Sequence, residues 1–223
     1  MKQQLTSIAL AAALGLAAMS AQAEGLSFNI GAVSLYKSNG IDQDDRANKS
    51  FNPAIQGGVD YDFGNGFYVG NWNSTGKFGD GANLEIDIYG GYSNELSNGL
   101  SYDVGVARYI YPGNTADYNA NEWYASFTYG IVTAKYTRGF GNGNKSARLG
   151  LSIEQPLSDK LTLKAGVGKR NSVNNDGASD FSLGLAYDMG SDMTLSAQVA
   201  GAQKSKVGDA GKTRLIVGVS KSF

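Results

Sequence analysis

The residue types in this chain limit the chemistry that it could perform. Its 223 residues include no His and no Cys. Catalysis by Ser-His or Cys-His pairs is therefore excluded, as are disulfides and the zinc, haem and iron–sulfur sites that His or Cys would ligate. Carboxylates and basic side chains remain as the groups that could bind or select a solute.

Three motifs could carry chemistry, and each has a plainer interpretation. The acidic run at 42–45, Asp-Gln-Asp-Asp, could bind Ca²⁺ or bridge to lipopolysaccharide, but it lacks calcium-loop spacing, which favours a solvated loop. The run GFGNG at 139–143 resembles a phosphate-binding loop, yet no helix follows it, which favours a turn. Glu85 and Asp87 could act as paired carboxylates, but nothing else indicates a glycosidase. We predict no enzyme, metal site or cofactor.

The charged residues are distributed unevenly along the chain. Residues 24–130 carry 13 acidic and 5 basic residues, whereas residues 131–223 carry 7 acidic and 13 basic ones. The two parts therefore have net charges of −8 and +6. Because the whole chain has a formal net charge of only −1, its charge does not argue for a nucleic-acid partner.

The N-terminal segment has the features of an export signal. Lys2 supplies a positive start, residues 8–19 are apolar, and Ala21 and Ala23 flank Gln22 in a small-x-small cleavage site. An uncleaved membrane helix is the alternative, but twelve residues are too few, because spanning a bilayer takes about 20. We therefore predict that residues 1–23 are cleaved and that residues 24–223 form one domain.

Beyond this segment the apolar residues recur every second position, as in strands with one apolar face. The pattern predicts twelve strands, at 25–37, 53–62, 66–74, 82–93, 99–111, 121–129, 131–139, 146–155, 160–170, 179–188, 192–202 and 211–223. Their connections alternate between long polar loops and short turns. This alternation is typical of an outer-membrane barrel with periplasmic turns, so we predict an all-β, antiparallel, up-and-down transmembrane barrel. A soluble sandwich or lipocalin-like barrel would not sort its connections by length so regularly.

Aromatic residues lie near both ends of the predicted strands, as in the girdles of a membrane barrel. Those beside the long loops are Tyr36, Trp72, Tyr111 and Trp123, and those beside the short turns are Tyr61, Phe63, Tyr92, Tyr102, Tyr129, Tyr187 and Phe223. In the last strand Leu215, Val217, Val219 and the terminal Phe223 share one face. This arrangement resembles the signal that the barrel assembly machinery reads.

Several stretches of the chain resemble the TorF-type porins of proteobacteria. The specific match is AIQGGVDYDFGNGFYVG within residues 52–72, supported by LEIDIYGGY at 84–92, LSYDVGVARYIYPG at 100–113, EWYASFTYG at 122–130, AKYTRGF at 134–140 and VGVSKSF at 217–223. The resemblance implies an outer-membrane barrel with a transport role. One departure is Asn39-Gly40-Ile41-Asp42, where the family has Arg-Gly-Ile-Ser, so a role of that Arg is not transferred.

Charged residues that alternate with the apolar ones along the predicted strands would point into the barrel, and they give a hypothesis for function. The acidic set is Asp60, Glu85, Asp87, Asp103 and Glu122, and the basic set is Lys135, Arg148, Lys164, Arg170 and Arg214, with Glu154 as an exception. Twelve strands enclose a backbone cylinder of roughly 24 Å, which side chains reduce to about 10 Å at most. We predict a passive porin for small polar solutes, lined by an acidic wall that faces a basic wall.

The alternative is a non-conducting structural or binding barrel in which opposite charges pair and close the interior. In either case the predicted surroundings are the cell outer membrane, with its lipid and lipopolysaccharide. Arg108 has the parity of the lipid-facing residues. It would either extend its guanidinium to the headgroups or lie beside a bulge that reverses the faces.

Overall fold

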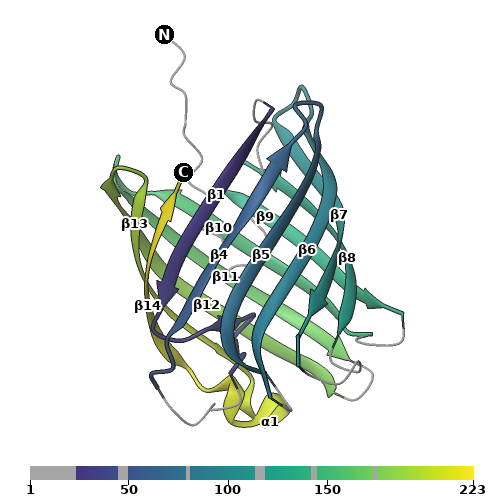
Figure 1. The fold of residues 1–223 in the computed structure, drawn as a ribbon, viewed down its shortest axis with the longest axis vertical. Helices are drawn as coiled ribbons and strands as arrows, with labels where there is room; N and C mark the ends of the chain where they lie inside the picture. The colour runs from purple at the N-terminus through teal and green to yellow at the C-terminus, as the bar shows by residue number, and fades with distance from the viewer. Residues whose placement is uncertain (1–23, 45–49, 79–80, 114–118, 142–144, 173–174) are drawn as a thin grey trace.

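The computed structural model describes residues 24–44, 50–78, 81–113, 119–141, 145–172 and 175–223, and it describes no side chains for 172–176. Twelve antiparallel strands form a closed barrel in the order β1-β14-β13-β12-β11-β10-β9-β8-β7-β6-β5-β4 (Figure 1). They are β1 (Gly25–Val33), β4 (Ala54–Asp62), β5 (Phe67–Phe78), β6 (Ala82–Glu95), β7 (Leu100–Ile110), β8 (Ala120–Tyr129), β9 (Val132–Phe140), β10 (Ala147–Pro156), β11 (Leu161–Ser172), β12 (Asn175–Gly190), β13 (Met193–Ala202) and β14 (Arg214–Ser222). The predicted twelve-stranded up-and-down barrel is confirmed.

The barrel closes where its first strand meets its last. β1 pairs with β4 on one side and with β14 on the other, from Asn29 opposite Ser222 to Val33 opposite Gly218. Phe28 and Phe223 extend this seam with two backbone hydrogen bonds, at 2.9 and 3.2 Å. Closure leaves no free sheet edge, which is the condition for a β-structure to remain stable in lipid.

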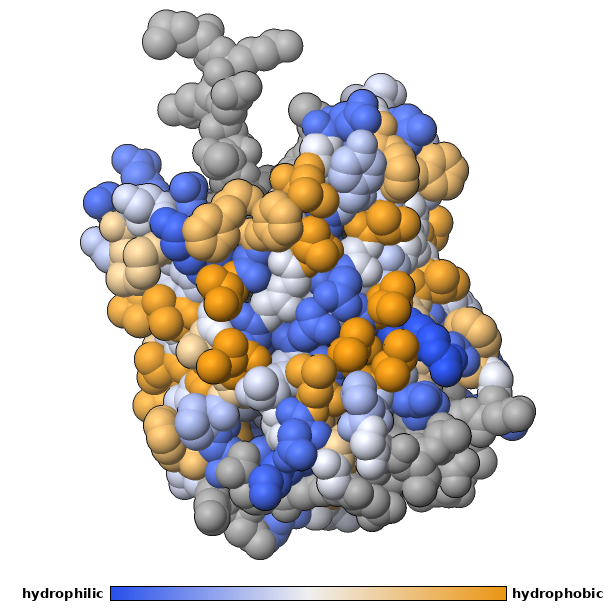
Figure 2. Space-filling model, viewed as in Figure 1, coloured by the Kyte–Doolittle hydropathy of each residue, from blue (hydrophilic) through white to orange (hydrophobic). Residues whose placement is uncertain are grey.

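Alternation along each strand gives the barrel an outer face and an inner face. Large exposed apolar side chains occur at every second position, for example Leu149, Leu151 and Val167. Figure 2 shows such residues spread over the wall between two more hydrophilic ends, with some hydrophilic surface in the middle. On the outer face of β5, Asn73 donates a hydrogen bond to Asn71 at 2.6 Å, which reduces the cost of exposing these polar groups.

The connections distinguish the two ends of the barrel. Short connections gather at one end, here called the turn end, where the C-terminus also lies (Figure 1). The carboxylates of Asp62 and Asp188 accept hydrogen bonds from the backbone N–H groups of Gly64 and Gly190, both at 2.7 Å. Such bonds fix tight turns. The other end, here called the loop end, carries the longer connections.

Two short helices in the last loop were not predicted. α1 (Lys204–Val207) and η2 (Gly208–Gly211) follow β13 at the loop end. None of the helices in the described part of the chain is long and apolar enough to cross a membrane.

The first loop departs most from prediction, because the expected strand 25–37 ends at Val33. The chain then turns into the barrel and forms a hairpin of β2 (Lys37–Ser38) and β3 (Ile41–Asp42). Residues 34–42 are here called the inner hairpin. Its turn, Asn39-Gly40, has positive φ at both residues, 48° and 73°. Alternating polarity predicted a longer strand, but it could not show where the chain leaves the wall.

Candidate functional site

The inner hairpin crosses the interior of the barrel at the loop end. Its Tyr36 packs on Trp72 and Phe78 of β5, with ring centres 5.6 and 6.3 Å apart. The turn at Gly40 lies against the backbone of Gly201 on β13 and against Asp180 on β12. Since β5 and β12 are five strands apart in a ring of twelve, this segment spans much of the barrel's width.

A buried ion pair anchors the hairpin. Lys37 Nζ lies 2.6 Å from Asp42 Oδ1, and both side chains are completely buried. The same ammonium donates a hydrogen bond to the carbonyl oxygen of Ala210 at 2.9 Å, and Arg214 Nε lies 3.5 Å from Asp42 Oδ2. Burial lowers the pKa of Lys37, and the bond to Asp42 opposes this shift. The pair therefore ties the first loop to the last.

These contacts correct the expectation for the acidic run at 42–45. Asp42 and Asp44 are 7% and 4% exposed, so neither belongs to a solvated loop. Arg214 also departs from the predicted open basic wall, because its guanidinium lies beside a carboxylate of the inner hairpin. In the residues described, no group of three or more Asp or Glu has the arrangement of a metal site.

Four of the five predicted acidic residues accept hydrogen bonds from tyrosine hydroxyls on the inner face. The pairs are Tyr89 with Asp60, Tyr68 with Asp103 at 2.6 Å, Tyr109 with Glu122 at 3.1 Å and Tyr111 with Glu85 at 2.7 Å. Asp87 lies opposite Trp72 in the β5–β6 register. Buried carboxylates need such donors, because an unsatisfied charge in a low dielectric is costly. The acidic wall is therefore also a tyrosine wall.

The tyrosines pack as well as donate. Tyr68, Tyr89 and Tyr124 form a buried cluster with Ala107, and the hydroxyls of Tyr68 and Tyr124 are hydrogen-bonded to each other. Lys135 on β9 places its ammonium 4.6 Å from the centre of the Tyr124 ring. The interior beside β5–β8 is thus filled by ordered aromatic side chains.

The basic set lies on the following strands, and two of its members, Arg148 and Lys164, form ion pairs within the same half of the chain. Arg148 donates two hydrogen bonds to Asp180, at 2.6 and 2.9 Å. Lys164 Nζ lies 2.8 Å from Glu154 Oε1 near the turn end. Arg170 stands directly opposite Arg148 across β10 and β11. The Lys164–Glu154 pair joins neighbouring strands, and the Arg148–Asp180 pair reaches across β11 from β10 to β12, so neither of these two pairs crosses the barrel.

The aromatic girdle predicted at the loop end is largely wrong. Tyr36, Trp72 and Tyr111 belong to an inner apolar cluster beneath the hairpin, and among the four only Trp123 is clearly exposed, at 38%. At the turn end Phe63, Tyr129, Tyr187 and Phe223 are exposed, as a membrane girdle requires. Tyrosine favours strands generally and also bonds buried carboxylates, so its position near a strand end does not by itself decide its direction.

Other predicted residues lie on the outer face. Arg108 is exposed and donates a hydrogen bond to Asn121 at 2.9 Å. The β6–β7 register has no shift beside it, so the alternative with a bulge is wrong. Leu215, Val217, Val219 and Phe223 are all exposed on one face of the last strand. Ala21 and Ala23, and with them the cleavage site, lie outside the described residues.

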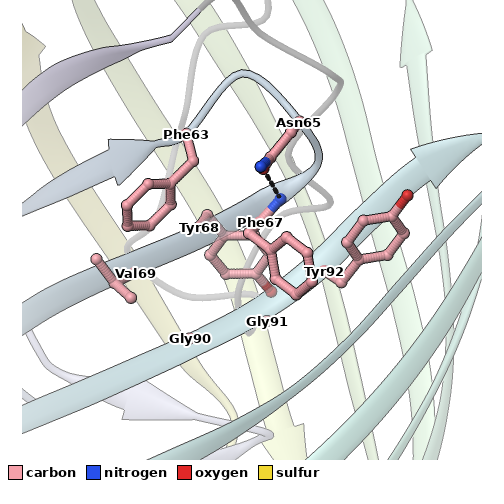
Figure 3. Close-up of a pocket in the computed structure, with 8 residues that line it drawn as sticks. All are labelled: Phe63, Asn65, Phe67, Tyr68, Val69, Gly90, Gly91 and Tyr92. Carbon is pink, nitrogen blue, oxygen red and sulfur yellow. Dashed lines mark hydrogen bonds between the residues drawn. The ribbon is translucent and has the colours of Figure 1, made fainter.

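A shallow apolar hollow lies on the outer face near the turn end. Figure 3 shows the rings of Phe63, Phe67 and Tyr92 around it, over β5 and β6 and beside the turn that joins β4 to β5. The side-chain oxygen of Asn65 accepts a hydrogen bond from the Phe67 backbone N–H at 3.1 Å, which holds the turn above it. The hollow contains none of the predicted charged residues, so the inner face remains the candidate site.

Sequence reasoning missed the tyrosines and Asp180 as members of the inner face. A usable signal existed, because Tyr68 and Asp180 have the same inward parity as the predicted charges on neighbouring strands. The inner face can hold polar solutes by hydrogen bonds and charge.

Comparisons with known proteins agree with this geometry. A family model described as "Bacterial protein of unknown function (Gcw_chp)" matches residues 17–223. No curated protein matches the chain in sequence.

Among solved structures, a KdgM porin has a TM-score of 0.64 at 13% identity, covering 88% of this chain and 99% of that chain. A KdgM porin in complex with disordered oligogalacturonate has a TM-score of 0.63 at 13% identity, covering 89% and 98%. LpxR from Salmonella typhimurium has a TM-score of 0.52 at 10% identity, covering 88% and 99%. At these identities the likeness shows the fold alone, a porin-like outer-membrane barrel.

Proposed function

This chain belongs to the Gcw_chp family, and we propose that it is an outer-membrane channel for passive diffusion of small polar or charged solutes. The observation that carries the proposal is the closed barrel whose inner face bears charged and hydroxyl side chains while its outer face is apolar. Such a wall separates lipid from a polar interior. The resemblance to TorF-type porins belongs to this proposal.

The likeness to porin barrels supports a transport role over a catalytic one. One KdgM structure is named as a complex with oligogalacturonate, a polar solute, and we propose polar solutes as the class for this chain. The proposal contains no chemical reaction. It includes cleavage of residues 1–23, residence among outer-membrane lipid and lipopolysaccharide, and insertion by the barrel assembly machinery.

The pore-lining role of the predicted charges is part of the proposal. Arg148, Arg170 and Lys135 are the cations nearest to the tyrosine wall, and they give one side of the interior positive charge. Asp60 on β4 and Asp103 on β7 add negative charge, and each accepts a hydrogen bond from a tyrosine hydroxyl. Charged inner walls of this kind select solutes by charge and polarity.

A second candidate function is a non-conducting barrel that acts in structure or surface binding. The inner hairpin favours it, because Leu35 and Tyr36 fill the interior at the loop end with exposures of 1% and 8%. A permanently seated hairpin would leave the barrel closed.

Conductance in a planar bilayer separates the two candidates. Mature protein is refolded, shown by circular dichroism to be β-structured, and measured with reversal potentials in a salt gradient. Discrete conductance steps are expected from a channel. If folded protein stays silent under all voltages, the channel proposal is wrong and the closed barrel stands.

A further inference from the structure

Two arginines lie side by side on the inner face near the loop end. Arg148 on β10 and Arg170 on β11 are direct cross-strand partners, and both alternate with outward-facing neighbours such as Leu149 and Lys169. Like charges directly opposite each other on neighbouring strands destabilise a sheet. Local rules of this kind are broken mainly where a function benefits.

The guanidinium of Arg148 is held in one orientation. Asp180 binds it at two points, through Nε at 2.9 Å and Nη2 at 2.6 Å. The group lies against Gly150 and Gly168, and a Cβ atom at either glycine would collide with it. A cation fixed in this way binds an anion without first losing much side-chain freedom.

The carboxylates near Arg170 are bonded to other groups. Asp180 is bound to Arg148, and Arg170 makes no ion pair with any residue that the structure describes. Asp180 and Glu122 both attract the Arg170 guanidinium, but Asp180 is hydrogen-bonded to Arg148 and the Glu122 carboxylate accepts the Tyr109 hydroxyl. Arg148 repels the Arg170 guanidinium across the two strands. An anion beside Arg170 would relieve this repulsion.

We propose that the Arg148–Arg170 pair is an anion-binding subsite inside the barrel, which takes the carboxylate or phosphate group of a small solute. Guanidinium groups bind either oxyanion through paired N–H donors. The hairpin turn at Gly40 also touches Asp180, so the subsite lies beside the segment that crosses the interior. The inference that such anions are transported rests on the proposed channel function, whereas anion binding to the subsite can be measured without transport.

Calorimetric titration of the refolded protein in detergent tests the subsite, with succinate and inorganic phosphate as separate probes. Wild-type protein is expected to bind at least one, and the preferred probe identifies the oxyanion. Arg170→Gln should weaken binding about tenfold or more, because charged hydrogen bonds are lost. The affinity of Arg170→Lys should fall between those of the wild type and Arg170→Gln, since lysine keeps the charge but loses the paired donors.

Lys169→Gln is the matched control, because it removes one positive charge from the exposed outer side of the same strand. It should bind as the wild type does, and circular dichroism checks that each variant is folded. The subsite is refuted if wild-type protein binds neither probe, or if the Arg170 and Lys169 variants weaken binding equally.

Conductance keeps this test separate from that of the proposed function. Conductance without binding would overturn the subsite and leave the channel intact. Binding by a barrel that stays silent in the bilayer would support the subsite and overturn the channel.

Discussion

At the scale of single residues, the interior depends on tyrosine hydroxyls that bond buried carboxylates. Asp103 is only 2% exposed and Glu85 is 3% exposed. A carboxylate removed from water to this extent needs donors, and tyrosine supplies one together with a ring that fills space. Each pair therefore contributes both to packing and to the polarity of the inner face.

Replacing Tyr68 by Phe should destabilise the barrel by about 1–3 kcal/mol, because it leaves a buried carboxylate without this donor. Its hydroxyl donates to Asp103 at 2.6 Å and also bonds Tyr124. Urea unfolding of protein refolded into lipid vesicles measures the change. Tyr129→Phe is the control, since that ring is 65% exposed at the turn end and should lose almost nothing. Equal losses in both variants would contradict the argument.

At the scale of elements, the inner hairpin is the segment that occupies the interior at the loop end. Gly40 has φ of 73° and lies against the Gly201 carbonyl oxygen, so a side chain there must displace the turn. We expect Gly40→Ala to raise single-channel conductance. Gly99→Ala carries similar backbone strain, about 1–2 kcal/mol, but nothing lies within 4 Å of its Cβ position. It should conduct as the wild type does, and unchanged conductance in both would mean that the hairpin is not the narrowest point.

The helical segment of the last loop should respond to acid. Asp209 accepts hydrogen bonds from Lys212 and Lys204, which hold its pKa below the usual value of 3.8. A lowered folded-state pKa means that the ionised form stabilises the segment above pH 3.8, and that this stabilisation is lost as pH falls through the lowered value.

Amide hydrogen exchange across residues 204–212, corrected for intrinsic rates, should therefore show less protection below pH 3.8. Asp209→Asn should remove the pH dependence, whereas Asp159→Asn, at the turn end, should leave it. Persistence of the pH dependence in the Asp209 variant would assign it to another group.

The strands could be predicted from the sequence because an apolar residue at every second position has one simple cause, a wall with lipid on one side. The point at which a strand leaves the barrel wall could not be predicted, because the alternating pattern does not mark it. Tyr36 has the same parity as the apolar outer residues of β1, yet it belongs to the inner hairpin, whose contacts lie on β5, β12 and β13. Alternation along each strand was enough to assign the charged residues to the inner face. The tyrosine–carboxylate pairs could not be predicted, because they depend on the register between strands, which no local pattern contains.

At the scale of the whole molecule, the closing seam joins residues almost 200 positions apart, so the barrel is complete only when its last strand is in place. Phe223 contributes backbone bonds to Phe28 on this seam, while its ring is 66% exposed and lies 5.3 Å from the Lys221 ammonium. The ring is therefore available for recognition, and the backbone bonds do not depend on it.

Phe223→Ala separates assembly from stability, because it removes the ring and keeps the seam. If the assembly machinery reads this residue, folded barrel in the outer membrane should fall several-fold in cells, measured by heat-modifiable gel migration. Refolding of the purified variant into vesicles should match that of the wild type. Phe63→Ala removes a ring of 44% exposure from the same end without touching the last strand, and should assemble normally. An equal loss of folded barrel in cells and in vesicles would show that the ring is a structural contact. No loss of folded barrel in cells would show that the assembly machinery does not read the ring.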